Sequence, residues 1–323
     1  MIKVILCSRN GEKFIREQTE SILKQTEREF RLLISDDAST DATAEIEKDL
    51  ADENPDKILL VRQPSPSGSA CAHFLKVLSL YGKDDGYVMF SDQDDVWDPD
   101  KIEKTFSVMR EAEKKYGAGT PLLVHCDSRI TDEERNVISP SFVRYQKMSP
   151  ERNKLNQILV QNNVTGASCM INRSLICLVT ERPLPEHAVM HDQYLALAAA
   201  AFGHIVFTDQ ALYDYRQHKD NDLGAAKGSV LREITDRLGI FRKDGKTRKD
   251  MNRHSQNTYQ ALFRQAAEFY RLYKDKLTPQ QKHMLHAFVK MKDENRFRKI
   301  LTIFRYGFTF NRLHRTIGEC AFI

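Results

Sequence analysis

Short apolar runs alternate with amphipathic stretches over the first two thirds of the chain. The apolar runs predict strands, namely Ile2–Leu6, Phe30–Ser35, Ile58–Val61, Tyr87–Ser91 and Leu122–Cys126. Between them, the spacing of apolar residues predicts helices over 12–25, 41–50, 72–81 and 99–116. Strands that alternate with helices indicate an α/β fold, in which a mostly parallel sheet is covered by helices on both faces.

The pattern changes near residue 220, where strand signals end and aromatic residues recur at helical spacing. One such stretch runs from Tyr259 to Tyr273 and another from Phe297 to Phe308, while Pro279 suits the first turn of a helix between them. We therefore expect two domains: a sheet-based catalytic domain over residues 1–220 and a basic, mostly helical C-terminal region over residues 221–323.

The formal net charge of +4 hides an uneven distribution of charge along the chain. Residues 219–323 contain 23 Lys and Arg against 11 Asp and Glu, a net +12, whereas residues 1–218 have a net charge of −8. A basic region favours an anionic partner, either a membrane surface or nucleic acid. No nucleic-acid-binding motif accompanies it, so we expect no nucleic acid partner.

The end of the basic region has the pattern of a helix that lies on a membrane. From residue 297 on, aromatic residues alternate with arginines, and this pattern is typical of a helix on an anionic membrane surface. The residues concerned are Phe304, Phe308, Phe310, Arg305, Arg312 and Arg315. Helices that simply cover the sheet are the alternative.

Composition argues against several classes of protein. The chain is 41% hydrophobic and 29% charged, with a mean hydropathy of −0.52, and it has no apolar run long enough to span a membrane. Its N-terminus does not have the pattern of a signal peptide. The six cysteines show neither CxxC nor metal-ligand spacing, which favours reduced thiols. We therefore expect a cytoplasmic protein.

Two acidic clusters follow predicted strands, where a parallel sheet binds its ligands. The segment SDQDDVW places Asp92, Asp94 and Asp95 within four residues. Like charges at this density need a cation or hydrogen-bond donors, and carboxylate oxygens favour Mg²⁺ or Mn²⁺, which bind nucleotide phosphates. A solvated acidic turn is the alternative. The second cluster, DDASTD at 36–41, argues against it: there Asp37 can accept hydrogen bonds from a base or ribose, and Ser39 to Asp41 can cap a helix.

The order and spacing of several segments resemble a known family. CSRNGEKFIREQTESILKQT, FRLLISDDASTDAT and FSDQDDVWDPDKI look like the inverting family-two glycosyltransferases, which have a GT-A nucleotide-sugar-binding fold; the match covers roughly residues 1–220. DQDDVW, NNVTGASCMINRSL, MHDQYLALAAAAFG and LYDYRQHKDN look most like the rhamnosyltransferases of bacterial rhamnose-containing cell-wall polysaccharides. This narrower resemblance extends over nearly the whole chain.

The resemblance implies residues that hold the nucleotide sugar. Cys7, Ser8 and Arg9 would line the base, and Arg9 stands where many relatives carry an aromatic residue, so its guanidinium would stack on the base. Asp37 would contact the base and Asp92 would lie near the ribose. The remaining implied donor contacts are the backbone of Gly166, the loop that begins at Gly68, and Arg216 at the diphosphate. Relatives carry a basic or amide side chain four residues after the glycine that matches Gly68, and this chain does not.

A metal site and a catalytic base follow from the same resemblance. Asp94 and His218 would bind Mg²⁺ or Mn²⁺, with Asp95 in support. Asp192 matches the aspartate that acts as general base, and His191 replaces the glutamate that usually precedes it. Inversion needs such a base on the face of the sugar opposite the departing nucleotide. The structural alternative is that Asp192 caps the helix that follows. We expect Asp192 to serve both as the general base and as the cap.

We therefore expect an inverting glycosyltransferase at the cytoplasmic face of a membrane. By the resemblance, its donor is a nucleotide sugar, dTDP-rhamnose before others, and its acceptor is a lipid-linked saccharide in the synthesis of a cell-wall or surface polysaccharide. One alternative is the same chemistry with a UDP-hexose donor. Another is a non-catalytic nucleotide-sugar-binding protein, against which the joint presence of Asp92, Asp94 and Asp192 argues. A nucleic-acid-binding protein is the third.

Overall fold

A twisted sheet forms the centre of the molecule in the computed structural model, which describes residues 1–219, 248–312, 315–316 and 320. Nine strands pair in the order β3-β2-β1-β4-β8-β6-β9-β5, with β7 beside β6. They are β1 (Ile2–Ser8), β2 (Phe30–Asp36), β3 (Ile58–Arg62), β4 (Tyr87–Ser91), β5 (Val96–Trp97), β6 (Leu122–Thr131), β7 (Val137–Ser139), β8 (Cys169–Asn172) and β9 (His204–Arg216).

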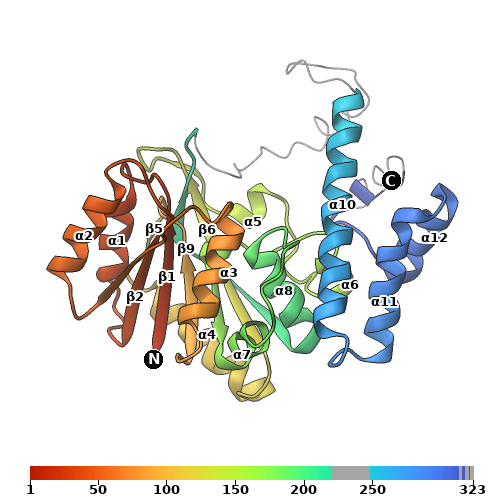
Figure 1. The fold of residues 1–323 in the computed structure, drawn as a ribbon, viewed down its shortest axis with the longest axis horizontal. Coiled ribbons are helices and arrows are strands. Elements are labelled where there is room, and N and C mark those ends of the chain that lie inside the picture. Colours follow the sequence, from red (N-terminus) through yellow and green to blue (C-terminus); the bar gives the residue numbers. More distant parts are fainter. Residues whose placement is uncertain (220–247, 313–314, 317–319, 321–323) are drawn as a thin grey trace.

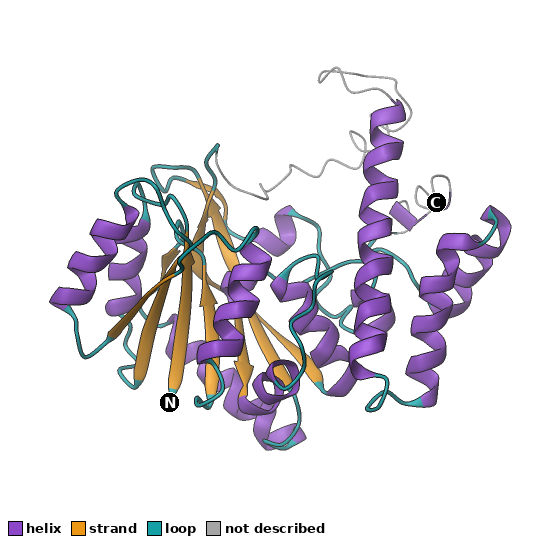
Figure 2. Ribbon diagram, viewed as in Figure 1, coloured by secondary structure: helices purple, strands orange, loops and turns teal. Residues whose placement is uncertain are grey.

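Helices pack against both faces of this sheet (Figure 2). In the described part of the chain the helices are α1 (Ile15–Leu23), α2 (Thr43–Glu53), α3 (Ala70–Tyr81), α4 (Lys101–Tyr116), α5 (Phe142–Tyr145), α6 (Leu155–Ile158), α7 (Arg173–Thr180), α8 (His191–Phe202), α10 (Arg248–Tyr273), α11 (Pro279–Lys290) and α12 (Arg296–Tyr306), with 3₁₀ turns at η1 (Gly166–Ser168) and η2 (Met291–Asp293). Among the described residues, no helix is both long and apolar enough to cross a membrane.

The predicted α/β fold is confirmed, and the sheet contains antiparallel strands as well. β1 pairs in parallel with β2 and β4, β2 with β3, and β6 with β9. β8 runs antiparallel between β4 and β6. The predicted strands and helices of the first 126 residues all form, with ends shifted by a few residues. Strands β5, β7, β8 and β9 were not predicted from the sequence.

Alternation along β1 explains why both faces of the sheet are covered. Ile5 and Cys7 point into one hydrophobic cluster, with α3, α7 and α8. Val4 and Leu6 point into a second cluster, with α1, α2 and α4. Since successive side chains of a strand alternate between faces, an apolar strand of this kind must be buried on both sides.

The C-terminal helices share the first of these clusters. Phe269 of α10, Phe288 of α11 and Ile303 of α12 are all fully buried in it, and the hydroxyls of Tyr194 (α8) and Tyr273 (α10) lie 3.0 Å apart. Figure 1 shows α10 to α12 on the far side of the sheet domain from α1 and α2. The predicted helical region is therefore present and is continuous with the core. The predicted boundary at residue 220 lies outside the described residues.

Two predictions made from the sequence differ from the structure. Phe308 is completely buried, because Gly307 ends α12 in a left-handed conformation (φ 67°) and directs the chain back to the core. Phe308 therefore does not belong to the exposed face of α12. At the start of α2 the N-cap is Ala42, although Asp41 Oδ1 does accept a hydrogen bond from the Thr43 N–H at 3.0 Å.

Candidate functional site

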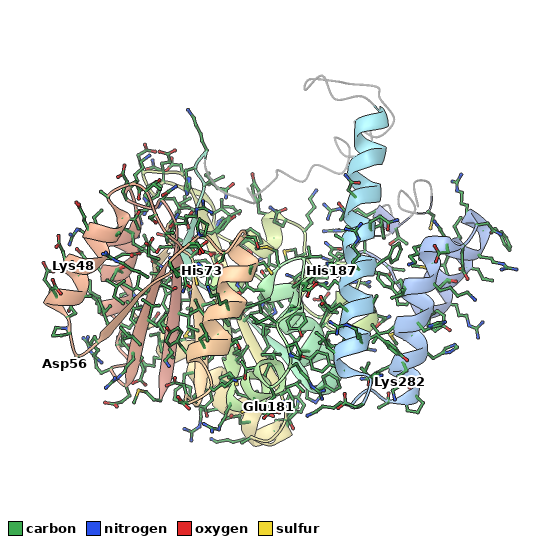
Figure 3. All side chains as sticks on the ribbon, viewed as in Figure 1. Lys48, Asp56, His73, Glu181, His187 and Lys282 are labelled. Atoms are coloured by element: carbon green, nitrogen blue, oxygen red, sulfur yellow. The ribbon has the colours of Figure 1, made fainter. Side chains whose placement is uncertain are left out.

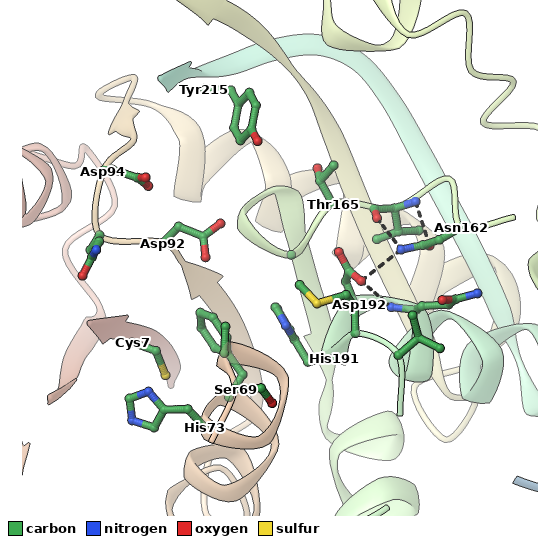
Figure 4. A pocket seen from close by; sticks show the side chains of 18 of the residues that line it. Cys7, Ser69, His73, Asp92, Asp94, Asn162, Thr165, His191, Asp192 and Tyr215 are labelled. Atoms are coloured by element: carbon green, nitrogen blue, oxygen red, sulfur yellow. Dashed lines mark hydrogen bonds between the residues drawn. The ribbon is translucent and has the colours of Figure 1, made fainter. Parts of the chain in front are cut away.

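A cavity of about 730 Å³ lies at the carboxyl ends of β1, β2 and β4 (Figure 4). The register of these strands explains its position, since Ser8 pairs with Asp36 and Leu6 with Ser91, so the polar residues that follow all three strands reach the same edge. The cavity is lined by nine of the predicted site residues, namely Cys7, Ser8, Arg9, Asp37, Gly68, Asp92, Asp94, Gly166 and Asp192.

The Asp37 side of the cavity is ordered by the loop that follows β3. The Asp37 carboxylate is 3% exposed and accepts hydrogen bonds from the backbone N–H of Ser67 at 2.8 Å and from its hydroxyl at 2.7 Å. Gly68 then has a φ of 89°, which favours glycine. On the adjoining helix, His73 (labelled in Figure 3) shares a hydrogen bond with Ser35 at 2.8 Å.

Gln93 joins the turn after β1 to the turn after β4. Its amide accepts from the Arg9 N–H at 2.7 Å and donates to the Arg9 carbonyl at 3.1 Å. A Cβ on Gly11 would lie 2.6 Å from Gln93 Cδ, so this contact requires glycine there. The contact of Gln93 with Gly11 was not predicted, because it joins two segments far apart in the chain.

The hydroxyl of Ser8, a residue that lines the cavity, makes its hydrogen bond inside the protein. Its Oγ donates to Glu47 Oε1 of α2, at 2.5 Å and within the protein interior. Burial raises the pKa of Glu47 to about 7. The second carboxylate oxygen of Glu47 has no hydrogen-bond partner in the part of the chain that the structure describes.

The two predicted metal ligands lie in direct contact. His218 Nε2 is 2.7 Å from Asp94 Oδ2, and the His218 ring packs on Phe14 with 4.9 Å between ring centroids. Asp94 and Asp92 both line the cavity (Figure 4), whereas His218 is not among the residues that line it. The described residues contain no ready-made group of three metal-binding side chains. The donor set fits Mg²⁺ or Mn²⁺ in the way usual for nucleotide enzymes, with a few protein ligands completed by phosphate and water.

Asp95 is buried below this turn and does not line the cavity. It is completely buried, and desolvation together with the charges of Asp94 and Asp92 holds the pKa of its carboxyl well above the ordinary value. A neutral Asp95 reduces the repulsion at the turn.

Arg216 does not line the cavity. Its guanidinium is 4% exposed, donates to the backbone carbonyls of Asp94 at 2.9 Å and Glu133 at 2.7 Å, and pairs with Glu17. These partners assign Arg216 to holding the Asp94 turn in place, in contrast to the diphosphate contact that the sequence predicted.

Asp192 faces the cavity from the first turn of α8. Its carboxylate accepts hydrogen bonds from the Gln193 N–H at 2.6 Å and from the Asn162 side chain at 3.0 Å. Met190 holds the N-cap position, so Asp192 is inside the helix and is not its cap. Burial raises the pKa of Asp192 to about 7, partly offset by these hydrogen bonds and one from the Gly166 backbone. A carboxylate that titrates near neutrality beside a cavity suits a general base.

His191 and Gly166 fit against each other next to this carboxylate. The His191 ring stacks on Phe74 with centroids 4.1 Å apart, and burial lowers its pKa to about 3, so it is neutral. A Cβ on Gly166 would lie 2.7 Å from His191 Cε1. The geometry thus explains this glycine by the approach of His191, a contact that the sequence did not predict.

Comparison with known proteins agrees with this geometry. The family model for Glycosyl transferase family 2 matches residues 3–178, which is more than half of the chain. The chain belongs to this family. It is therefore a glycosyltransferase, and the predicted family and GT-A fold are confirmed.

Two solved structures resemble the fold. TarS (residues 1–349) of S. aureus in complex with UDP-GlcNAc has a TM-score of 0.57 and 16% identity, and the match covers 94% of this chain and 78% of that one. The mannosyltransferase PcManGT from Pyrobaculum calidifontis in complex with GDP-Man and Mn²⁺ has a TM-score of 0.52 and 17% identity, over 94% of this chain and 84% of that one.

Two curated relatives carry specific names. The dTDP-rhamnosyl transferase RfbG of Shigella flexneri is 24% identical over 248 residues, which is 72% of this chain and 78% of the relative. The UDP-Glc:alpha-D-GlcNAc-diphosphoundecaprenol beta-1,3-glucosyltransferase WfgD of Escherichia coli is 26% identical over 148 residues, 46% of this chain and 54% of the relative.

Proposed function

We propose that this glycosyltransferase transfers a sugar from a nucleotide sugar with inversion and that Asp192 is its general base. The observation that carries the proposal is the position of Asp192: its carboxylate lines the same cavity as Asp92 and Asp94, on the helix α8 side, and its pKa is raised to about 7. At neutral pH a sizeable fraction is ionised and can accept a proton.

The chemistry then follows from these residues. The acceptor hydroxyl attacks the anomeric carbon, the bond from that carbon to the diphosphate oxygen breaks, and the hydroxyl proton passes to Asp192. The backbone of Cys7–Arg9, with Asp37 and Asp92, holds the nucleoside. Asp94 and His218 would hold a divalent cation, which when bound stabilises negative charge on the diphosphate.

The proposed donor is dTDP-rhamnose. The name of RfbG, whose match covers 72% of this chain, supports this donor. The sequence resemblance to rhamnosyltransferases supports it as well. A UDP-hexose is the second candidate, because WfgD is named for a UDP-glucose donor and TarS binds UDP-GlcNAc.

The proposed acceptor is a lipid-linked saccharide at the inner face of a membrane. WfgD is named for such an acceptor. On α12, Phe297, Leu301 and Phe304 are 77%, 58% and 57% exposed. They share one helix face, which exposed Arg298 and Arg305 flank. An exposed apolar stripe beside arginines suits binding to an anionic bilayer surface.

A panel of nucleotide sugars tests this function. Hydrolysis of dTDP-rhamnose, UDP-glucose and UDP-GlcNAc would be measured with Mn²⁺ and with EDTA. We expect metal-dependent release of one nucleotide, with dTDP-rhamnose the preferred substrate. Faster turnover of a UDP-sugar would establish the second donor. Tight binding without turnover of any donor, with or without a saccharide acceptor, would favour a non-catalytic protein.

A further inference from the structure

The segment that follows α12 forms part of the cavity wall. Arg315 lines the cavity, although it lies far beyond the residues 3–178 that the family model matches. The segment is attached to the loop before η1 by two hydrogen bonds: Asn311 N donates to Gln161 Oε1 at 2.9 Å, and Asn311 Nδ2 donates to Asn163 Oδ1 at 2.7 Å.

These attachments place Arg315 toward the Asp192 end of the cavity. Gln161 is next to Asn162, whose amide donates to Asp192 Oδ1 at 3.0 Å. The turn that carries Arg315 is closed by hydrogen bonds from Phe310 N to Thr316 Oγ1 at 3.0 Å and from Arg315 N to the Arg312 carbonyl at 3.0 Å. Thr316 is 1% exposed, so the turn is anchored in the protein.

The charges around the cavity give Arg315 a distinct place. The described lining contains four carboxylates, those of Asp37, Asp92, Asp94 and Asp192, and two arginines, Arg9 and Arg315. Arg9 lies in the turn after β1, where its backbone N–H donates to Gln93 Oε1 at 2.7 Å. Arg9 therefore belongs to the side of the cavity formed by the turns after β1 and β4, whereas the attachments of its segment place Arg315 on the Asp192 side.

We propose that Arg315 binds a phosphate group of the acceptor. This inference rests on the proposed function, because inversion requires the acceptor to approach from the side of Asp192, opposite the departing diphosphate. A guanidinium matches phosphate through paired N–H donors and stays charged at any physiological pH. The acceptor class is therefore a phosphate-bearing glycoside, such as a saccharide joined to a lipid through a diphosphate.

Calorimetry with a defined probe tests the proposal. The protein is first saturated with dTDP and Mg²⁺, so that the donor phosphate site is filled, and is then titrated with decyl diphosphate-linked N-acetylglucosamine. Decyl N-acetylglucosaminide, which has no phosphate, is the matched probe. The variants are Arg315→Gln and Arg315→Lys, with Arg312→Gln as control, since Arg312 is exposed on the same turn.

We expect Arg315→Gln to weaken binding of the diphosphate probe by roughly ten- to a hundredfold, the scale of a charged hydrogen bond. Arg315→Lys should fall between it and the wild type, and Arg312→Gln should match the wild type. Binding of dTDP and of the phosphate-free probe should not change. Unchanged affinity of Arg315→Gln for the diphosphate probe would overturn the proposal.

Two other outcomes would also overturn it. If Arg315→Gln weakens dTDP binding, the phosphate belongs to the donor. If it weakens binding of both glycosides equally, Arg315 contacts the sugar and not the phosphate. Should Arg315→Gln lose its cooperative thermal unfolding, Arg315→Lys supplies the comparison. Failure of the proposed function is recognised separately, by the absence of donor hydrolysis in the wild-type protein.

Discussion

His218 Nε2 lies 2.7 Å from Asp94 Oδ2, although 124 residues separate the two in sequence. Strand pairing brings them together: β9 returns antiparallel to β5, with Val96 opposite Asp214 and Trp97 opposite Tyr213. The ends of β4 and β9 therefore meet at the cavity, and two donor atoms suited to a divalent cation converge there.

Asp94→Asn should abolish metal-dependent donor binding, because the substitution removes a charged oxygen ligand beside His218. Calorimetric titration of the nucleotide sugar with Mn²⁺ and with EDTA measures this. Asp100→Asn is the matched control, since Asp100 makes a surface ion pair with Lys104, a contact worth little. Donor affinity that still rises with Mn²⁺ in Asp94→Asn would remove Asp94 from the metal site.

Gly166→Ala should destabilise the protein by about 1–3 kcal/mol, because its new methyl group would overlap the His191 ring. Urea unfolding measures the loss. Gly119→Ala is the control, since a Cβ there meets nothing within 4 Å. The cost of Gly166→Ala should shrink in a His191→Ala background, where the obstructing ring is gone. An equal cost in both backgrounds would show that His191 is not the cause.

The sequence predicted the parts of the site that are local. Asp92, Asp94 and Asp37 directly follow apolar strands, so their place at the sheet edge follows from the strand pattern alone. Contacts between distant segments were not predictable in this way. The partners of Arg216 and the fit of His191 against Gly166 both depend on how far-apart segments pack. The burial of Phe308 likewise depends on a single left-handed glycine, which the helical spacing does not reveal.

Replacing Phe297, Leu301 and Phe304 together with Ser should reduce binding to vesicles that contain phosphatidylglycerol. These side chains are exposed, so stability should change little. Sedimentation with anionic vesicles and with neutral phosphatidylcholine vesicles measures the effect. The control replaces Val137 and Ile138 of β7, which are 58% and 51% exposed, with Ser. If the α12 variant binds anionic vesicles as well as the wild type does, this face is not the membrane contact.

The rate of transfer should fall as the pH drops below about 7, because protonated Asp192 cannot accept a proton and its pKa is raised to about 7. The pH profile of kcat/KM, which reports the pKa values of the free enzyme, measures this. An unshifted Asp titrates near 4 when unfolded, so the folded state holds the extra proton between about pH 4 and 7. The ionised, buried Asp192 therefore lowers stability as the pH rises through that window.

The stability of Asp192→Asn relative to the wild type should accordingly increase from about pH 4 to about pH 8. Urea unfolding of both proteins across this range provides the measurement. A constant difference would mean that the pKa of Asp192 is not raised in the folded protein.

The assignment of Asp192 as general base is tested most directly by measuring donor affinity and sugar transfer in Asp192→Asn. Asparagine keeps the size of the side chain but cannot take the proton of the acceptor hydroxyl. We expect the dissociation constant of the nucleotide sugar to stay near that of the wild type and the transfer rate to fall by roughly 10²–10⁴-fold. Transfer at the wild-type rate in this variant would contradict the account and direct the search for the base to His191 and His218.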